Sequence, residues 1–133
     1  TDPSITKEKI FALAKLFHDN VGDGTYLEKG WTKVGYGTAS LCQNVYVRML
    51  GKDSDIVKRG IQVYTCSPGW VRTEMSEHTG PRSPDQGAQC PCNAVYLPWK
   101  IDPKYQGQVL YNCKPVNLNR DVESETTPPA SPR

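Results

Sequence analysis

Two segments near the N-terminus carry apolar residues at helical spacing. The first predicts a helix from about Lys7 to Asn20 with Thr6 as its N-cap, because apolar residues recur at intervals of three or four. These residues are Ile10, Leu13, Ala14, Phe17 and Val21. The stretch from Val21 to Gly24 follows. It contains Gly-x-Gly, but it comes after a helix and lacks the third glycine of a phosphate loop, so it predicts a C-cap and turn.

The second helical segment runs from Tyr36 to about Leu50. It has no proline, and no glycine after Gly37. Leu41, Val45 and Met49 repeat every four positions, and the apolar residues Cys42 and Tyr46 lie beside them. We therefore expect a second helix that is mostly buried.

Strand and helix signals alternate in the rest of the chain. Residues 61–66 alternate and are rich in β-branched and aromatic types, which predicts a strand. A helix begins after Ser83, with proline at its first position and glutamine at its third, and is expected to be interrupted at Pro91. Residues 107–113 predict a last strand. This alternation indicates an α/β fold whose sheet is parallel and buried on both faces.

Composition changes this picture mainly at the C-terminus. Residues 1–118 read as one domain, whereas residues 119–133 are rich in Asp, Glu, Ser, Thr and Pro and are expected to be a disordered tail. The formal net charge is +2, with acids and bases interspersed. No basic stripe for nucleic acid stands out.

The cysteines favour free thiols in a reducing compartment. There are five, an odd number, and Cys90-Pro91-Cys92 lacks the Cys-x-x-Cys spacing and a second pair, so we expect no metal site. No apolar run approaches the roughly 20 residues that span a bilayer, and no leader peptide is recognisable. We expect a cytoplasmic protein that binds no membrane. The chain starts at Thr1 without a methionine, which leaves open that residues precede it.

Three collinear stretches resemble a known family. They are Ile5-Thr6 with the following helix and Glu28-Lys29-Gly30-Trp31, then Tyr36-Gly37 with its helix, then the run from Cys66 to Met75 that contains Pro-Gly-Trp-Val-Arg-Thr. The run from Ser4 to about Leu118 resembles the C-terminal half of a short-chain dehydrogenase/reductase, in particular a monomeric NADPH-dependent carbonyl reductase. The fold implied is the C-terminal half of a Rossmann-type doubly wound parallel sheet, incomplete because its N-terminal strands are missing.

The resemblance implies that Tyr36 is the catalytic tyrosine. The family pattern is Tyr-x-x-x-Lys, and here Ser40 occupies the position of the lysine. In the family the ammonium group, one helical turn away, favours the phenolate form of the tyrosine. Lys33 precedes the helix and Arg48 lies about 18 Å along it by helical rise, so neither reaches the phenol by local geometry. The family's carbonyl-polarising serine would fall upstream of Thr1.

The resemblance also implies the cofactor NADP(H). Pro68, Gly69, Val71 and Thr73 match the turn that contacts the nicotinamide side of the cofactor, and Trp70 matches a residue bordering the substrate pocket. A plain strand-to-helix turn is the competing interpretation. The family's Gly-rich pyrophosphate turn does not occur in these 133 residues. We expect no NADPH binding tighter than about millimolar.

These observations predict a carbonyl reductase-like fragment or degenerate paralogue that is not catalytic as this chain alone. One alternative is a non-enzymatic interaction module that reuses the half-fold and covers its open sheet edge by self-association or with a partner chain. The other alternative is that the chain is one piece of a complete, active carbonyl reductase. Only in that case would it act on a small carbonyl substrate.

Overall fold

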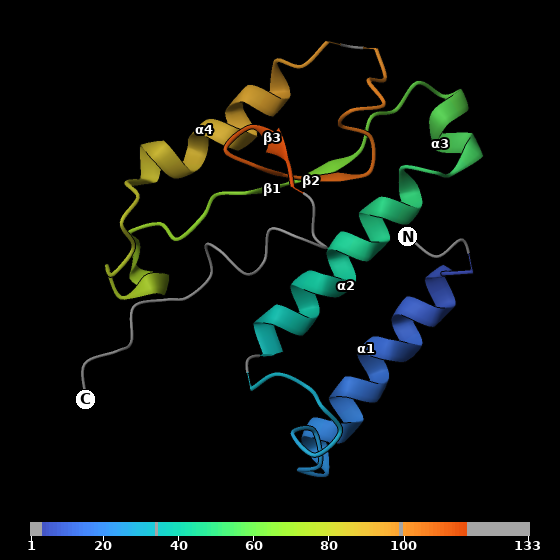
Figure 1. Ribbon diagram of the computed structural model, residues 1–133, viewed down its shortest axis with the longest axis vertical. Coiled ribbons are helices and arrows are strands. Elements are labelled where there is room, and N and C mark those ends of the chain that lie inside the picture. Colours follow the sequence, from blue (N-terminus) through green and yellow to red (C-terminus); the bar gives the residue numbers. More distant parts are fainter. Residues whose placement is uncertain (1–3, 34, 99, 117–133) are drawn as a thin grey trace. The chain divides into compact units, whose positions relative to one another are not determined.

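The computed structural model describes residues 4–33, 35–98 and 100–116. Figure 1 shows the order of the helices and strands. The described residues divide into two compact units, one with the residues up to Thr65 and those from 97 to 109, the other with Cys66–Tyr96 and the described residues from Leu110 on. Each unit is described by itself. The expected boundary between residues 118 and 119, and the expected disordered tail, lie outside the described residues.

The first unit begins with α1 (Lys7–Gly22), which confirms the first predicted helix. The Thr6 hydroxyl accepts a hydrogen bond from the backbone N–H of Lys9, as an N-cap does. The helix ends at Gly22, and Gly24 has a φ of +76°, as expected for a turn rather than a phosphate loop. Of the apolar stripe, Ile10 is buried but Leu13 and Val21 are exposed.

The second predicted helix is α2 (Gly35–Leu50), which runs beside α1 in Figure 1. The ring of Phe17 on α1 packs against Trp31 in the preceding loop, with centroids 5.2 Å apart. The expectation that α2 is mostly buried is wrong, because Thr38 is its buried residue and Leu41 is 52% exposed. The physical reason is that α1 covers only one side of it within this unit.

A short helix that sequence reasoning missed, α3 (Ser54–Lys58), follows α2. Asp53 caps it, since its carboxylate accepts from the backbone N–H groups of Asp55 and Ile56. Asp, Ser and Asp around residue 54 are a recognisable N-terminal signal. Five residues are too few to show a helical repeat of apolar positions, so the sequence carries no periodic signal for this helix.

The predicted strand at residues 61–66 is displaced: β1 is Tyr64–Ser67. The segment before it is bonded to a loop instead of a neighbouring strand. Gln106 accepts from the Val63 N–H through its side-chain oxygen and donates to the carbonyl of Ile61, while the Gly107 N–H donates to the carbonyl of Val63. The side chain of Gln106, 43 residues from Val63 in sequence, thus supplies the hydrogen bond that the backbone of a neighbouring strand would otherwise provide.

The sheet has the order β1-β2-β3, with β2 at Gln108–Tyr111 and β3 at Lys114–Pro115. β2 and β3 are antiparallel and pair Leu110 with Pro115 and Tyr111 with Lys114. A continuous strand to residue 113 and a wholly parallel sheet are therefore both wrong. The reason is a two-residue turn at Asn112 and Cys113, whose φ values of 48° and 61° suit a type I′ hairpin.

In the second unit, a 3₁₀ turn at Glu74–Ser76 (η1) precedes α4 (Pro84–Val95). Ser83 and Gln86 form the predicted capping box, each side chain bonding the other's backbone N–H. The predicted interruption at Pro91 is wrong, since α4 continues to Val95. A proline inside a helix costs about 3 kcal/mol, but Cys90 and Ala94 on either side are buried, and their packing holds the helix together.

Among the described residues, no helix combines the length and apolar character needed to cross a membrane.

Candidate functional site

Tyr36 and Ser40 lie one helical turn apart in the first turns of α2, in the first unit. Tyr36 is 76% exposed, and Ser40 is half-buried. The helix places both residues on one face, as Tyr-x-x-x-Ser spacing predicts. The catalytic assignment of Tyr36 stays a prediction.

Cations near this end of α2 are few. Arg48 is the one Lys or Arg in the helix sequence, and twelve residues at 1.5 Å each put it about 18 Å from Tyr36 along the axis. Lys33, which precedes α2, is exposed. Within the described helix α2, no Lys or Arg therefore lies one turn from Tyr36, where the family lysine would be.

The segment Pro68–Thr73 lies in the second unit, where it leaves β1 as an irregular turn. Gly69 has a φ of +74°, a conformation that residues with a Cβ rarely adopt. A Cβ atom on it would lie 2.9 Å from Cδ of Arg82 and 3.1 Å from Cε2 of Tyr111. Glycine is needed here both for the backbone angle and for the close approach of these two side chains.

Arg82, which sequence reasoning missed, ties this turn to the rest of the unit. Its backbone pairs with the turn on both sides: the Arg72 N–H donates to its carbonyl at 2.8 Å, and its own N–H donates to the Trp70 carbonyl at 3.3 Å. This pairing makes a parallel bridge between Val71 and Arg82.

The guanidinium of Arg82 reaches the hairpin and α4. Nη1 donates to Oδ1 of Asn112 at 2.6 Å, Nη2 donates to the carbonyl of Gln86 at 3.0 Å, and the charge lies 5.5 Å from the ring centre of Tyr111. A lone arginine between Pro81 and Ser83 gives no sequence signal for these contacts, because its partners come from three separate segments.

Val71 and Thr73 are fixed by a loop of hydrogen bonds centred on Ser76. The Ser76 hydroxyl donates to the carbonyl of Val71 at 2.6 Å and accepts from the Thr73 N–H at 3.0 Å. The side chain of Val71 lies against Gly87 of α4, where a Cβ atom would be 2.6 Å from its Cγ2. The main-chain atoms of positions 71 and 73 are thus held in one arrangement, and their role toward a cofactor stays a prediction.

Trp70 is 53% exposed and leans over the 3₁₀ turn. Its indole N–H donates to the Thr79 hydroxyl at 3.3 Å, and that hydroxyl donates to the carbonyl of Ser76 at 2.6 Å. Two consecutive residues with positive φ, Glu77 (50°) and His78 (58°), close the loop beneath it. Trp70 is thus half exposed and tied by its indole N–H to the loop, and its role at the border of a substrate pocket stays a prediction.

The thiols of Cys66, Cys90 and Cys113 lie close enough together for the last two to affect the ionisation of Cys66. Burial raises the pKa of Cys66, the residue two before Pro68, to about 11, and the neighbouring thiols of Cys90 and Cys113 add to the rise. Cys113 in turn accepts a hydrogen bond from the side-chain amide of Asn93 at 3.0 Å. At neutral pH Cys66 is a protonated packing residue rather than a nucleophile.

All five cysteines are free thiols. In the part of the chain that the structure describes, no group of three or more His, Cys, Asp or Glu residues is arranged to hold a metal ion.

Comparison with known structures supports the α/β class. The chain matches salutaridine reductase from Papaver somniferum with a TM-score of 0.69 and 27% identity, over 83% of this chain and 35% of that protein. The α/β fold class is confirmed, as a match to about a third of a Rossmann-type reductase.

Comparison with known sequences gives the same class. The NADPH carbonyl reductase 1 of Mus musculus is 33% identical over 97 residues, 71% of this chain and 35% of that protein. The corresponding protein of Sus scrofa is 31% identical over 123 residues, 91% of this chain and 42% of that protein. No family model matches the chain.

The chain is thus a partial homologue of short-chain dehydrogenases/reductases, which confirms the resemblance carried by its motifs. In particular it is similar to the carbonyl reductases named above. It spans 35% to 42% of the length of these curated relatives.

Proposed function

We propose that this chain carries the tyrosine-bearing and nicotinamide-facing part of an NADPH-dependent, carbonyl reductase-like protein, and that the 133 residues alone do not reduce carbonyl compounds. The similarity to proteins named NADPH carbonyl reductase supports the cofactor and the reaction type. We further propose that it works in the cytoplasm, since five free cysteines suit a reducing compartment.

The observation that carries the proposal is the fixed Pro68–Thr73 turn. Gly69 admits the close approach of the Arg82 and Tyr111 side chains, and the backbone of Arg82 and the hydroxyl of Ser76 hold the turn through main-chain groups of residues 70–73. A turn held in one conformation before binding loses little entropy when a ligand arrives. Such a turn suits recognition of one face of a nicotinamide ring.

Three features favour the absence of catalysis by the chain alone. Ser40 cannot supply the positive charge that favours a phenolate at Tyr36, and general acid assistance typically contributes about 10²- to 10⁴-fold in rate. Furthermore, Tyr36 is 76% exposed, so water would compete for its hydroxyl. These 133 residues also contain no Gly-rich pyrophosphate turn.

The test is a titration of the purified chain with NADPH by calorimetry and by amide NMR. We expect a dissociation constant of about millimolar or weaker, because one edge of a dinucleotide offers few contacts. Nicotinamide mononucleotide, used as a probe, should shift the amides of residues 69–73, whereas adenosine 2′,5′-bisphosphate should leave them unchanged. A micromolar constant for NADPH, or equal shifts from both halves, would overturn the proposal.

A second candidate function is an interaction module, favoured by one observation. β1 is the first strand in the order β1-β2-β3, so within the described residues one of its edges has no neighbouring strand. Such an edge can pair with a strand from a second copy or from a partner chain. Light scattering across a concentration series tests self-association. If the protein stays monomeric at all concentrations, self-association is excluded and this edge could pair only with a different chain.

A further inference from the structure

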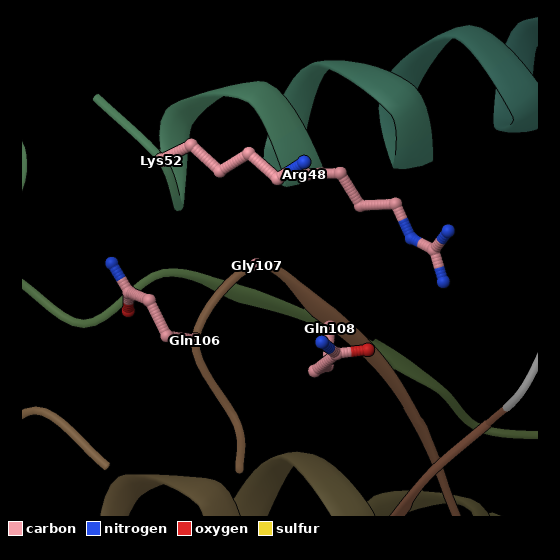
Figure 2. Close-up of a pocket in the computed structure, with 5 residues that line it drawn as sticks. All are labelled: Arg48, Lys52, Gln106, Gly107 and Gln108. Carbon is pink, nitrogen blue, oxygen red and sulfur yellow. The ribbon is translucent and has the colours of Figure 1, made fainter. Parts of the chain in front are cut away.

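A pocket and most of the thiol groups of this chain lie in different units. Figure 2 shows the pocket, a hollow of about 280 Å³ in the first unit that is lined by Arg48, Lys52 and residues 106–108. None of these lining residues is a cysteine. Four of the five cysteines belong to the second unit, and Cys42 is the one in the first. The sulfur chemistry of the chain is therefore concentrated in the second unit.

Three thiols of the second unit come from three separate elements. Cys66 lies on β1, Cys90 lies on α4, and Cys113 lies in the turn between β2 and β3. Cys90 and Cys113 are close enough to Cys66 to affect its ionisation. The fold thus gathers three thiols that are far apart in sequence.

The sulfur atom of Cys113 lies against α4. The side-chain amide of Asn93 donates a hydrogen bond to this sulfur at 3.0 Å, and the thiol donates weakly to the backbone carbonyl of Gln89 at 3.9 Å. Cys90 directly follows Gln89 in the helix. By covalent geometry its Cα lies about 2.8 Å from that carbonyl oxygen, so the Cys113 sulfur lies within about 7 Å of the Cys90 Cα. The hairpin turn therefore holds one thiol beside the helical segment that carries the other.

The two thiols differ in their access to solvent. Cys90 is 2% exposed, so an oxidant in solution does not reach it directly. Cys113 is half-buried in the hairpin turn, and its hydrogen bond with Asn93 lies at the exposed surface. An accessible thiol next to a shielded second thiol is the usual arrangement of a cysteine that senses oxidants.

We propose that Cys113 is a site of oxidation by a hydroperoxide, and that Cys90 then forms a disulfide with it. In the first step the Cys113 sulfur attacks the O–O bond of hydrogen peroxide, which gives a sulfenic acid and one molecule of water. In the second step the Cys90 sulfur attacks the sulfenic sulfur, the S–O bond breaks, and a second molecule of water leaves. The two thiols lose two electrons and two protons in total, and the peroxide is reduced to water.

The disulfide would link the hairpin turn to α4. It closes a loop from residue 90 to residue 113, and such a cross-link stabilises a folded unit mainly by restricting the unfolded chain. Asn112, the residue before Cys113, accepts a hydrogen bond from the guanidinium of Arg82, whose backbone holds the Pro68–Thr73 turn. Oxidation is thus a covalent brace on the unit that contains this turn, and a dithiol reductant reverses it.

The test is treatment of the purified, reduced full chain with hydrogen peroxide, followed by alkylation of the remaining thiols, tryptic digestion and mass spectrometry. We expect a cross-linked peptide pair that joins Cys90 to Cys113 and that disappears after treatment with dithiothreitol. A disulfide that joins Cys113 to Cys66 or to Cys92 instead, or no disulfide at all, would overturn the proposal.

Single-cysteine variants separate the two roles. Cys90→Ser leaves the sulfenic acid of Cys113 without a second thiol, so labelling of Cys113 by dimedone should rise by about tenfold over the wild-type protein. Cys113→Ser should leave Cys90 reduced, because the oxidant does not reach a buried thiol. Cys92→Ser removes an exposed thiol from the same helix and is the matched control; its cross-linking should stay within about twofold of the wild type.

Circular dichroism of the reduced proteins establishes that each variant keeps its helices. Cys90→Ala provides the same test if Cys90→Ser does not fold, because it removes the thiol without burying a hydroxyl group. Equal dimedone labelling of Cys113 in the wild-type protein and in the Cys90 variant, or oxidation of Cys90 in Cys113→Ser, would contradict the assigned roles.

Discussion

The two parts of the predicted site are held in opposite ways. In the second unit, the Pro68–Thr73 turn is bonded to Arg82, Ser76 and Gly80. In the first unit, Tyr36 projects from a helix end and is 76% exposed. A reductase-like turn can thus be held completely by contacts inside one unit, whereas the position of the tyrosine depends on little besides its helix.

The physical reason lies in where each backbone finds its hydrogen-bond partners. A helix satisfies its own N–H and C=O groups through neighbours four residues away, so α2 can hold Tyr36 with one face open to water. An irregular turn has no such partners and needs groups from elsewhere in the chain. The backbone of Arg82 and the hydroxyl of Ser76 supply them, and the guanidinium of Arg82 anchors that residue to Asn112, 30 residues further along the chain.

The largest expected effect comes from adding a side chain at Gly80, which packs against the backbone of Val71. A Cβ atom in Gly80→Ala would lie 2.6 Å from the carbonyl oxygen of Val71, so the turn must shift. We expect a loss of about 3 kcal/mol in the free energy of unfolding, measured by urea denaturation. Gly22→Ala, at the open end of α1 with nothing within 4 Å, is the control and should be neutral or slightly stabilising. Equal effects of the two changes would contradict the contrast between the units.

Removal of the Arg82 guanidinium should have the next largest effect. Arg82→Met keeps the aliphatic stem but loses the bonds to Asn112 and to the Gln86 carbonyl, and we expect destabilisation of about 2 kcal/mol. Amide exchange at Arg72, whose N–H donates to the Arg82 carbonyl, should accelerate. Arg59→Met removes an exposed arginine at the C-cap of α3 and should cost less than about 0.5 kcal/mol. Unchanged exchange at Arg72 would mean that the guanidinium does not hold the turn.

A smaller effect should appear at alkaline pH, through Cys66. Its pKa is raised from 9.0 to about 11 in the folded protein, chiefly by burial, so the unfolded chain loses this proton first. Its contribution to stability is therefore complete below about pH 9 and is lost as the pH rises toward 11.

The measurement is urea denaturation between pH 7 and pH 10.5. The wild-type protein should lose stability above pH 9 more steeply than Cys66→Ala, while exposed Cys92→Ala should follow the wild-type slope. Parallel slopes for all three proteins would show that Cys66 is not shielded behind the turn.

The smallest expected effect is at Tyr36. Because the side chain is 76% exposed, Tyr36→Phe should change the free energy of unfolding by less than about 0.5 kcal/mol in urea denaturation. Tyr111→Phe in the second unit is the contrast: it keeps the cation–π contact with Arg82 but loses the hydrogen bond that the guanidinium donates to the phenol oxygen at 3.4 Å, so it should cost more than Tyr36→Phe. A large cost for Tyr36→Phe would show that this end of α2 is held by contacts of its side chain.

The features that rest on local chemistry could be predicted from the sequence. The start of α1 at Lys7, its Thr6 cap and the Ser83 and Gln86 start of α4 follow from residues within four positions of one another, whereas α1 ends at Gly22, two residues later than expected. The motif from Cys66 to Met75 also sufficed to indicate the reductase resemblance, which the comparisons confirm.

The tertiary structure decided what depends on residues far apart in sequence. Pro91 stays helical because Cys90 and Ala94 are buried, β1 starts late because Gln106 bonds to residues 61 and 63, and Arg82 holds the turn. Such pairings give no periodic signal, because hydrogen bonding and packing act between atoms that meet only after the chain has folded. Local propensity therefore set the elements of this protein, and long-range contacts set their limits and the shape of its candidate site.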